Sequence, residues 1–428
     1  MWCTPMRAVP RHLRAICNLV LLATTVVPLA RAGEPPLGIA EALAISEQRS
    51  SKLAAQSSAV TAASEQIGRS GQLPDPKVRF GVDNLPVSGT DAYSLTSDFM
   101  TMKRIGIMQE VPNGEKRRAR GERAERERAL ESVGLEALRA QLRQDTAVSW
   151  LELYYAQRTR DTVEQLVRQY ELEADTVSAA VTAGRVSPAS AVMLRAALET
   201  ARDRVLEQRR AVLRAQAALS ALVGNAARRP LGTAPDTTTL AHSPTALVGN
   251  LETHPALRVY KEREALAESE VALATSSAKP DWSVEVLYGQ RSPNFSNMVT
   301  VMFSIDLPFD KAKRQDRDVA ARASLLDRAR SESEDARRAH EADVRTMISD
   351  WEISGERARR FEKLLLPLAR ERTELALAAY SGGRGDLAAV LEARRAEIET
   401  QLSLITAELE RGRAWARLNH LVPHEVKP

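Results

Sequence analysis

One sequence pattern occurs twice in this chain, at an offset of about 200 residues. Each copy opens at a Pro-Asp pair, continues through two short segments of alternating polarity and ends in a long charged stretch. The landmarks that recur are Pro74 and Pro280, Trp150 and Trp351, and Gly184 and Gly383. This repeat predicts that the chain folds as two copies of one helix–hairpin–helix unit.

The N-terminal segment, 1–32, differs from the rest of the chain. Arg7, Arg11 and Arg14 precede an uncharged, apolar run over 16–30, and small residues flank Arg31. A basic start, a short apolar run and small residues at the end are typical of a secretory signal peptide, and the run is too short to span a membrane. We expect a mature chain that starts near Gly33 and carries no lipid anchor.

The leader also explains the basic composition. The chain has 60 Lys and Arg against 56 Asp and Glu, and four of the arginines lie in the leader, so the remainder is close to neutral. The basic pI therefore gives no reason to expect a nucleic-acid partner. Both cysteines, Cys3 and Cys17, also lie in the leader. The mature chain is expected to have neither disulfides nor a thiolate metal site.

Apolar residues recur in steps of three and four through four long stretches, which predicts helices packed along their length. Only 4% of the residues are aromatic, so a thick core is not expected and thin helical packing suits the composition. The predicted long helices cover 121–183, 190–222, 316–379 and 388–421, and Pro367 should kink the third. Shorter helices are expected over 38–72 and 254–277.

The segments after the Pro-Asp pairs alternate between apolar and polar residues. The clearest are Trp282–Gln290 and Met298–Leu307, and the first half repeats them within 78–111. A period of two with one apolar face indicates half-buried strands. Their lengths are close to the roughly 9–11 residues of a tilted membrane strand. An ordinary sheet packed on a soluble core is the other interpretation, because alternation is a weak signal for a single strand.

Four strands are too few to close a barrel, since small barrels need about eight. Open sheet edges are not tolerated in lipid, where unpaired backbone groups cost several kcal/mol each. If these strands cross a membrane, several chains must therefore share one barrel. The polar faces of the strands then line the interior, with the residues Arg79, Asp83, Arg104, Glu285 and Asp306.

The sequence resembles outer-membrane efflux channels of the TolC family over nearly all of 37–425. The resemblance rests on the segments 73–76 and 279–282, on the strand exits 111–117 and 307–309, and above all on the corner 378–393. It implies a mainly α-helical chain with membrane β-structure. In such a homotrimer a 12-stranded barrel, four strands per chain, continues into a periplasmic helical barrel. It divides the chain into repeats over 37–225 and 245–425, joined by a linker over 226–244.

The resemblance is strongest to the heavy-metal branch, the outer-membrane components of cobalt–zinc–cadmium and copper–silver systems. It implies an outer-membrane location, contact with lipid, and partnership with a periplasmic adaptor and an inner-membrane pump of the RND class. A drug-efflux or type I secretion channel remains the alternative. Soft thioethers suit Cu(I), and gap filling is the other interpretation of the methionines Met100, Met102 and Met108. No cofactor and no dedicated metal site are expected.

The resemblance also places a gate at the helical corners. Glu392 matches an acidic position of the family, whereas Ala389 stands where the family has a second acidic residue, and Asp386 is the nearest substitute. Arg195 and Arg394 occupy equivalent positions in the two halves and are expected to pair with these acids. Rings of charge from three chains control passage in channels of this kind.

No sequence motif for catalysis is present, so an enzyme is not expected. Two other classes of protein remain open: a periplasmic coiled-coil adaptor, and a structural coiled-coil protein. The doubled hairpin and doubled strand pair favour the channel over both.

Overall fold

The computed structural model describes residues 35–182 and 187–422. The expected signal peptide and the first helical corner at 183–185 lie outside these residues. From Pro36 onward, the described residues belong to one compact unit. Among the helices that the structure describes, none has both the length and the apolar character needed to cross a membrane.

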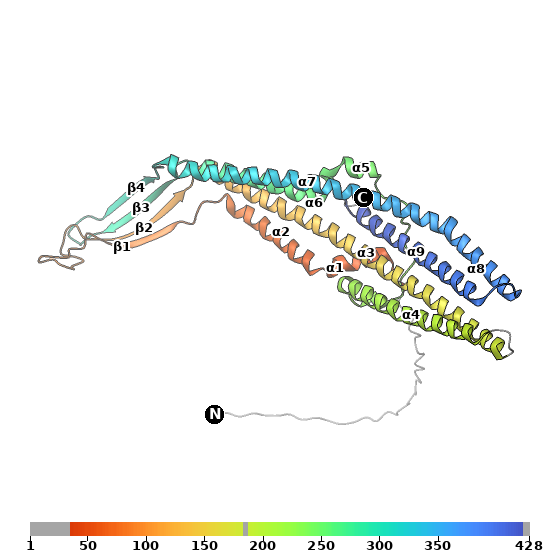
Figure 1. The fold of residues 1–428 in the computed structure, drawn as a ribbon. Helices are drawn as coiled ribbons and strands as arrows, with labels where there is room; N and C mark the ends of the chain where they lie inside the picture. Colours follow the sequence, from red (N-terminus) through yellow and green to blue (C-terminus); the bar gives the residue numbers. More distant parts are fainter. Residues whose placement is uncertain (1–34, 183–186, 423–428) are drawn as a thin grey trace, which may run out of the picture. The chain divides into compact units, whose positions relative to one another are not determined.

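Long helices dominate this unit and confirm the prediction from periodicity (Figure 1). Helix α3 packs against both α4 and α9, and α7 packs against α9. Side-chain caps begin the helices where the chain turns: the Ser187 hydroxyl accepts from the Ser190 N–H at 3.2 Å. The long helices are α3 (Gly114–Thr182), α4 (Pro188–Val223), α7 (Gln315–Arg360), α8 (Leu366–Ser381) and α9 (Leu387–Asn419).

Pro367 interrupts the third long helix, as its chemistry requires. It has no N–H to donate to the carbonyl of Lys363. A π-helical turn, Phe361–Leu365, fills the gap, and the Leu366 N–H donates to the Phe361 carbonyl. The predicted single helix is therefore two helices, α7 and α8, joined by this turn.

The shorter helices differ in part from the prediction. The first is split into α1 (Ile39–Arg49) and α2 (Ser51–Ser70), because Ser50 is extended and its hydroxyl accepts from the Leu53 N–H at 3.2 Å. Helix α6 (Pro255–Ser277) matches the prediction. The short helix α5 (Pro244–Gly249) was not predicted.

Two strands from each half form one antiparallel sheet in the order β1-β2-β3-β4. Its bounds are β1 (Lys77–Asp83), β2 (Met102–Val111), β3 (Trp282–Gln290) and β4 (Met298–Ile305), which confirms the predicted strands, although β4 ends before Leu307. The two halves meet at the β2–β3 pairing, where Ile107 lies opposite Val286. The duplicated units therefore share one sheet.

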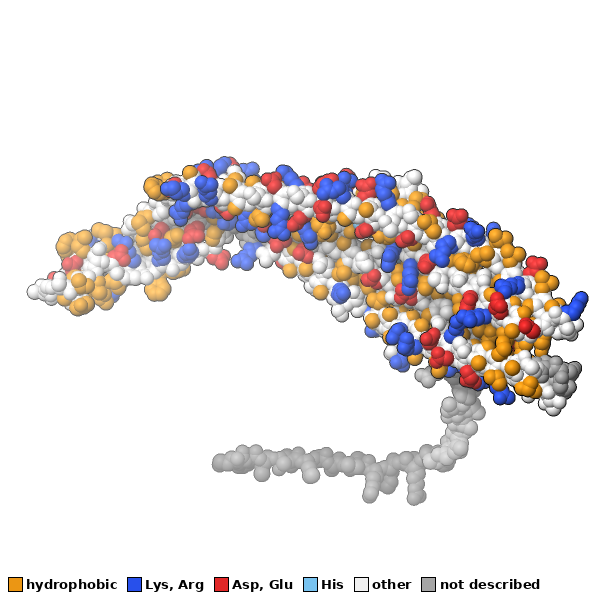
Figure 2. Space-filling model, viewed as in Figure 1, with side chains coloured by type: hydrophobic (Ala, Val, Ile, Leu, Met, Phe, Trp, Pro, Cys, Tyr) orange, Lys and Arg blue, Asp and Glu red, His pale blue; other side chains and the backbone are white. Residues whose placement is uncertain are grey.

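The register divides the sheet into two chemically distinct faces. Apolar side chains from all four strands lie on one face and are exposed, among them Phe80 at 86% and Phe303 at 73%. Figure 2 shows hydrophobic side chains gathered over the sheet and mixed charges along the helices. The apolar face comprises Val78, Phe80, Val82, Ile105, Ile107, Val111, Trp282, Val284, Val286, Tyr288, Val299, Val301, Phe303 and Ile305.

Away from the sheet, the largest core cluster is built around Trp150, which is fully buried. Its indole N–H donates to the Leu37 carbonyl at 3.0 Å, which fixes the start of α1 against α3. A second cluster joins α3, α4 and α9 near the corners and includes Tyr170 and Leu198. These clusters hold the two helical hairpins together along their length.

Candidate channel lining and gate

The polar face of the sheet brings four of the predicted lining residues together in pairs. Arg104 forms an ion pair with Asp83 across β1 and β2. The Arg79 Nη1 atom lies 3.4 Å from Glu285 Oε2, which links the first half to the second. The sequence alone does not predict this pairing, because it depends on the register between the two halves.

Asp306 lies one residue beyond β4 and outside the sheet, at the base of the strands. Its N–H donates to the Asp281 carbonyl at 2.9 Å. The Asp281 carboxylate accepts from the Asn113 N–H at 2.9 Å and from Lys116 Nζ at 2.6 Å. Asp281 thereby joins the Pro-Asp segment before β3 to the strand exit that begins α3. Although burial acts in the opposite direction, the Lys116 ammonium and the Asn113 N–H hold the pKa of Asp281 below its usual value.

The three methionines singled out from the sequence have different environments. Met100 lies in the loop before β2 and is 48% exposed. Met102 is buried. Its sulfur would lie 3.2 Å from a Cβ placed on Gly289, so the Met102 side chain packs over this glycine. Met108 is half-buried and lies directly opposite Glu285. Gap filling accounts for Met102 but does not account for Met108.

Leu287 is the one large apolar residue of β3 on the polar face. It lies directly opposite Gly106 and is only 6% exposed. A Cβ on Gly106 would lie 2.5 Å from the Val286 carbonyl oxygen and 2.6 Å from Leu287 Cδ2. The missing side chain at Gly106 therefore leaves the space that Leu287 fills.

The corner between α8 and α9 carries the first predicted gate residue. The turn uses Gly383 at a φ of 69°, a left-handed conformation that glycine adopts easily. Asp386 then caps α9, and its carboxylate accepts from the Ala389 N–H at 2.8 Å. Asp386 has a structural role at the corner in addition to the charge it contributes.

Glu392 and Arg394 lie on different sides of α9. The Glu392 carboxylate is exposed and accepts from Arg372 Nη2 of α8 at 2.9 Å. Arg394 instead forms a largely buried ion pair with Glu173 of α3. The expected pairing of Arg394 with Glu392 or Asp386 is therefore not formed within one chain, because the Arg394 side chain faces α3. Burial raises the pKa of the Glu173 carboxyl, and the Arg394 guanidinium opposes this shift.

Arg195 lies on α4 and is exposed. Among the residues that the structure describes, it has no ion-pair partner within the chain. The corner that precedes α4 lies outside the described residues. The structure therefore gathers Asp386, Glu392 and Arg394 at one corner and leaves Arg195 on the neighbouring hairpin.

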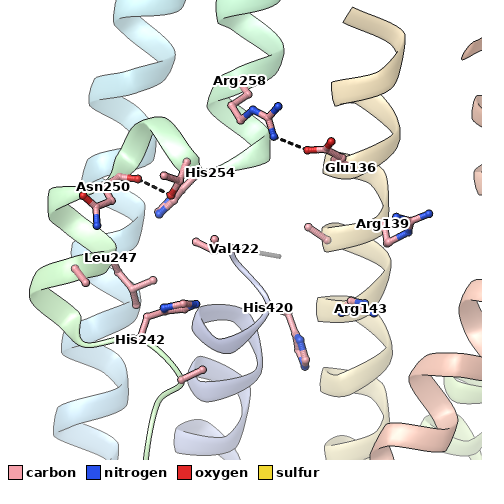
Figure 3. Close-up of a pocket in the computed structure, with 14 residues that line it drawn as sticks. Glu136, Arg139, Arg143, His242, Leu247, Asn250, His254, Arg258, His420 and Val422 are labelled. Atoms are coloured by element: carbon pink, nitrogen blue, oxygen red, sulfur yellow. Dashed lines mark hydrogen bonds and ion pairs between the residues drawn. The ribbon is translucent and has the colours of Figure 1, made fainter. Parts of the chain in front are cut away.

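A cavity of about 740 Å³ lies between α3, the linker, α6 and the end of α9, and sequence reasoning did not find it. Figure 3 shows His242, His254 and His420 approaching it from the linker, the start of α6 and the end of α9. His254 Nδ1 lies 2.8 Å from His340 Nε2. Burial, with His340 and His242 nearby, lowers the pKa of His254 to about 4. These histidines come from separate elements, so their spacing in the sequence gave no signal.

In the part of the chain that the structure describes, no three or more His, Cys, Asp or Glu side chains are placed to hold a metal ion together.

The sequence matches the family model described as outer membrane efflux protein over residues 42–225 and 248–422. Among curated proteins, none is similar enough in sequence to match the chain. Channels of this family are trimeric ducts and not enzymes, and they work with adaptors and inner-membrane pumps. The channel interpretation is thereby favoured over the adaptor and the structural coiled coil.

Solved structures share the fold. CusC, described as forming a transmembrane channel, matches with a TM-score of 0.76 at 15% identity, covering 89% of this chain and 90% of its own. The outer membrane protein VceC of Vibrio cholerae matches with a TM-score of 0.74 at 16% identity, covering 90% and 95%. The MtrE outer membrane channel of Neisseria gonorrhoeae, in its open state, matches with a TM-score of 0.71 at 16% identity, covering 90% and 88%. The chain belongs to the outer membrane efflux protein family and is an outer-membrane channel with a large periplasmic portion.

Proposed function

We propose that this channel is the exit duct for heavy-metal cations, and that it works with a periplasmic adaptor and an inner-membrane pump of the RND class. The observation that carries the proposal is the chemistry of the polar sheet face. That face combines the carboxylates of Asp83 and Glu285 with the thioethers of Met102, Met108, Met298 and Met302. Thioethers bind soft metal ions, and Arg104 and Arg79 balance the charge of the two carboxylates.

The barrel follows from the edges of the sheet. Strands β1 and β4 each lack a neighbour on one side within the described chain. Three chains joined edge to edge give twelve strands and leave no open edge, which lipid requires. The exposed apolar face then contacts lipid, and the polar face lines the duct.

The two repeats supply matching halves of the wall. We propose repeats over 37–225 and 245–425, with 226–244 as the linker between them. The pairing of β2 with β3 supports this division, because it places one strand pair of each repeat side by side. The end of the second repeat, 423–425, lies outside the described residues.

At the periplasmic end we propose a gate formed by Asp386, Glu392, Arg195 and Arg394. Glu392 pairs with Arg372 of the same hairpin, and Arg394 pairs with Glu173 of the other hairpin. The first pair is exposed and easily broken, whereas the second is shielded from solvent. We assign Glu392 and Asp386 to the charge ring, Arg394 to the link between hairpins, and Arg195 to contact with a neighbouring chain.

Growth of a strain that lacks the gene tests the proposal. We expect greater sensitivity to at least one of copper, silver, cobalt, zinc or cadmium, with resistance restored by the wild-type gene. Sensitivity to dyes or antibiotics with unchanged metal tolerance would contradict metal export and favour the drug-efflux alternative. Loss of a secreted protein from the medium would favour type I secretion.

A further inference from the structure

The polar face of the sheet contains one row in which a carboxylate lies between two thioethers. Glu285 of β3 lies directly opposite Met108 of β2 and directly opposite Met302 of β4. Directly opposite residues on antiparallel strands have Cβ atoms about 4.5–5.5 Å apart and project to the same face. The row therefore brings two sulfur atoms to the two sides of one carboxylate.

Glu285 is unusually buried for a residue on the polar face, at only 6% exposed. Its Oε2 atom lies 3.4 Å from Arg79 Nη1, at the long end of a charge-assisted contact. Its Oε1 atom is buried and has no hydrogen-bond partner in the described chain. A buried acceptor left without a partner destabilises the folded state, so this oxygen is placed to gain from a bound cation.

The two methionines differ from the buried Met102. Met108 is half-buried and Met302 is 41% exposed, so neither side chain is enclosed in the way that Met102 is. Neither lies opposite a glycine: Met108 lies opposite Lys77 and Glu285, and Met302 lies opposite Glu285. Filling the space beside a glycine therefore does not explain why methionine occurs at these two positions.

We propose that Met108, Glu285 and Met302 form a binding site for a soft monovalent cation, Cu(I) or Ag(I), on the duct wall. The proposal rests on the proposed export of metal cations and names the ion class and the residues. Thioether sulfur selects soft ions, and the free carboxylate oxygen adds a third ligand. Because Arg79 already balances the charge of Glu285, a monovalent ion leaves less uncompensated charge than a divalent one.

Titration with Ag(I) of the mature protein in detergent, without the leader that carries Cys3 and Cys17, tests this site. Ag(I) is used alone because it needs no reductant. We expect a single tight site per chain in the wild type. The double variant Met108→Leu with Met302→Leu keeps the volume of both side chains. It should bind Ag(I) more than about a hundredfold more weakly, beyond what the loss of an outer-shell partner costs.

The matched control is Met193→Leu, on helix α4, where Met193 is exposed to a similar degree at 47%. Its Ag(I) affinity should equal that of the wild type. Glu285→Gln, which keeps the shape but removes the charge, should weaken binding without abolishing it. Equal affinity for the wild type and the double variant, or no tight site in the wild type, would overturn the proposal.

X-ray absorption of the silver-loaded wild type gives a second readout that does not depend on how a variant folds. Sulfur neighbours around silver are expected, and a shell of oxygen or nitrogen alone would overturn the assignment. The growth assay separates this inference from the proposed function. If the deletion strain is sensitive to metals but the purified protein has no tight silver site, the binding site is wrong and the proposed export of metals stands. If the protein binds silver tightly but the deletion strain tolerates metals as the wild type does, the proposed export of metals is wrong and the binding site stands.

Discussion

Trp150 and Trp351 make the same hydrogen bond in the two halves of the chain. The Trp150 indole N–H donates to the Leu37 carbonyl at 3.0 Å, and the Trp351 indole N–H donates to the Thr237 carbonyl at 3.0 Å. In each half the acceptor lies near the start of the repeat: Leu37 is the first residue of the first repeat, and Thr237 lies in the linker before the second. The duplication therefore extends to how each long helix holds the chain that precedes it.

The two tryptophans should differ in their contribution to stability. Trp150 is fully buried, whereas Trp351 is half-buried. Trp150→Phe removes the N–H donor and leaves a cavity, so we expect a loss of about 2–4 kcal/mol in the free energy of unfolding. Trp351→Phe should cost about 1 kcal/mol, because water can fill its site.

Thermal unfolding of both variants in detergent, followed by helical circular dichroism, measures this difference. The Leu37 carbonyl keeps a second donor, the Gly232 N–H at 3.0 Å, so the effect of Trp150→Phe arises mainly from packing. A larger loss in Trp351→Phe than in Trp150→Phe would contradict the ranking.

Gly106 offers a sharper test of the sheet. A Cβ at this position would lie 2.5 Å from a carbonyl oxygen of the neighbouring strand. This clash is with the backbone, so no change of side-chain conformation can remove it. Gly106→Ala should therefore disrupt the β2–β3 pairing and reduce the yield of assembled trimer in the outer membrane. Gly81→Ala is the matched control, since Gly81 lies on the same face and a Cβ there meets nothing within 4 Å. Equal trimer yields from the two variants, measured by heat-modifiable migration on gels, would show that the pairing is not this tight.

Periodicity predicted the strands well because each strand carries its own alternation. It did not predict which residues meet across strands. Leu287 breaks the alternation of β3, and the reason lies in Gly106, which belongs to the other half of the chain and lies directly opposite in the sheet. Glu285 likewise reads as an ordinary lining residue until its burial between strands is known. The local sequence pattern determines where a strand forms, whereas the register between strands determines which residues surround each side chain.

The helices show the same division. Their spacing predicted the long stretches, and Pro367 predicted the interruption of the third. The break at Ser50 was not predicted, because the sequence does not show the extended backbone on which the capping role of this serine depends. The Arg394–Glu173 ion pair was missed because it joins residues of different halves. The same holds for the histidines around the cavity.

The gate proposal predicts a change in conduction when charge is removed at the α8–α9 corner. The double variant Asp386→Asn with Glu392→Gln removes both charges, and asparagine keeps the helix cap at Asp386. Loss of the exposed Glu392–Arg372 pair should shift the corner toward an open arrangement and raise single-channel conductance in planar bilayers. An exposed pair contributes at most about 1 kcal/mol, so the shift per chain should not exceed roughly fivefold.

Glu410→Gln is the matched control for that experiment. Glu410 pairs with Arg357 at 2.7 Å, and both side chains are exposed, as those of the gate pair are, but the pair lies far from the corner along α9. Conductance and cation preference should remain at wild-type values in this variant. A double variant that conducts as the wild type does would remove Asp386 and Glu392 from the gate.

The buried His254–His340 contact predicts how stability depends on pH. Burial lowers the pKa of His254 to about 4, from an ordinary value of 6.5, and it also lowers the pKa of His340, where Asp343 acts in the opposite direction. Because the folded state resists protonation, the unfolded chain takes up more protons below its own pKa. Stability is therefore complete above pH 6.5 and falls as the pH decreases toward 4, by about 2 kcal/mol near pH 5 for His254 alone.

His254→Asn tests this prediction, because the amide can replace Nδ1 in the contact with His340 but does not titrate. His340 is present in both proteins, so its own contribution to the pH dependence is common to the two, and Glu136 at the same site is paired with Arg258 at 2.5 Å. The unfolding temperature of the wild type should fall between about pH 7.5 and pH 5, and that of the variant should fall by distinctly less. If the two proteins lose stability in parallel over this window, protonation of His254 is not the cause, and the cavity that it lines admits the charged imidazole without cost.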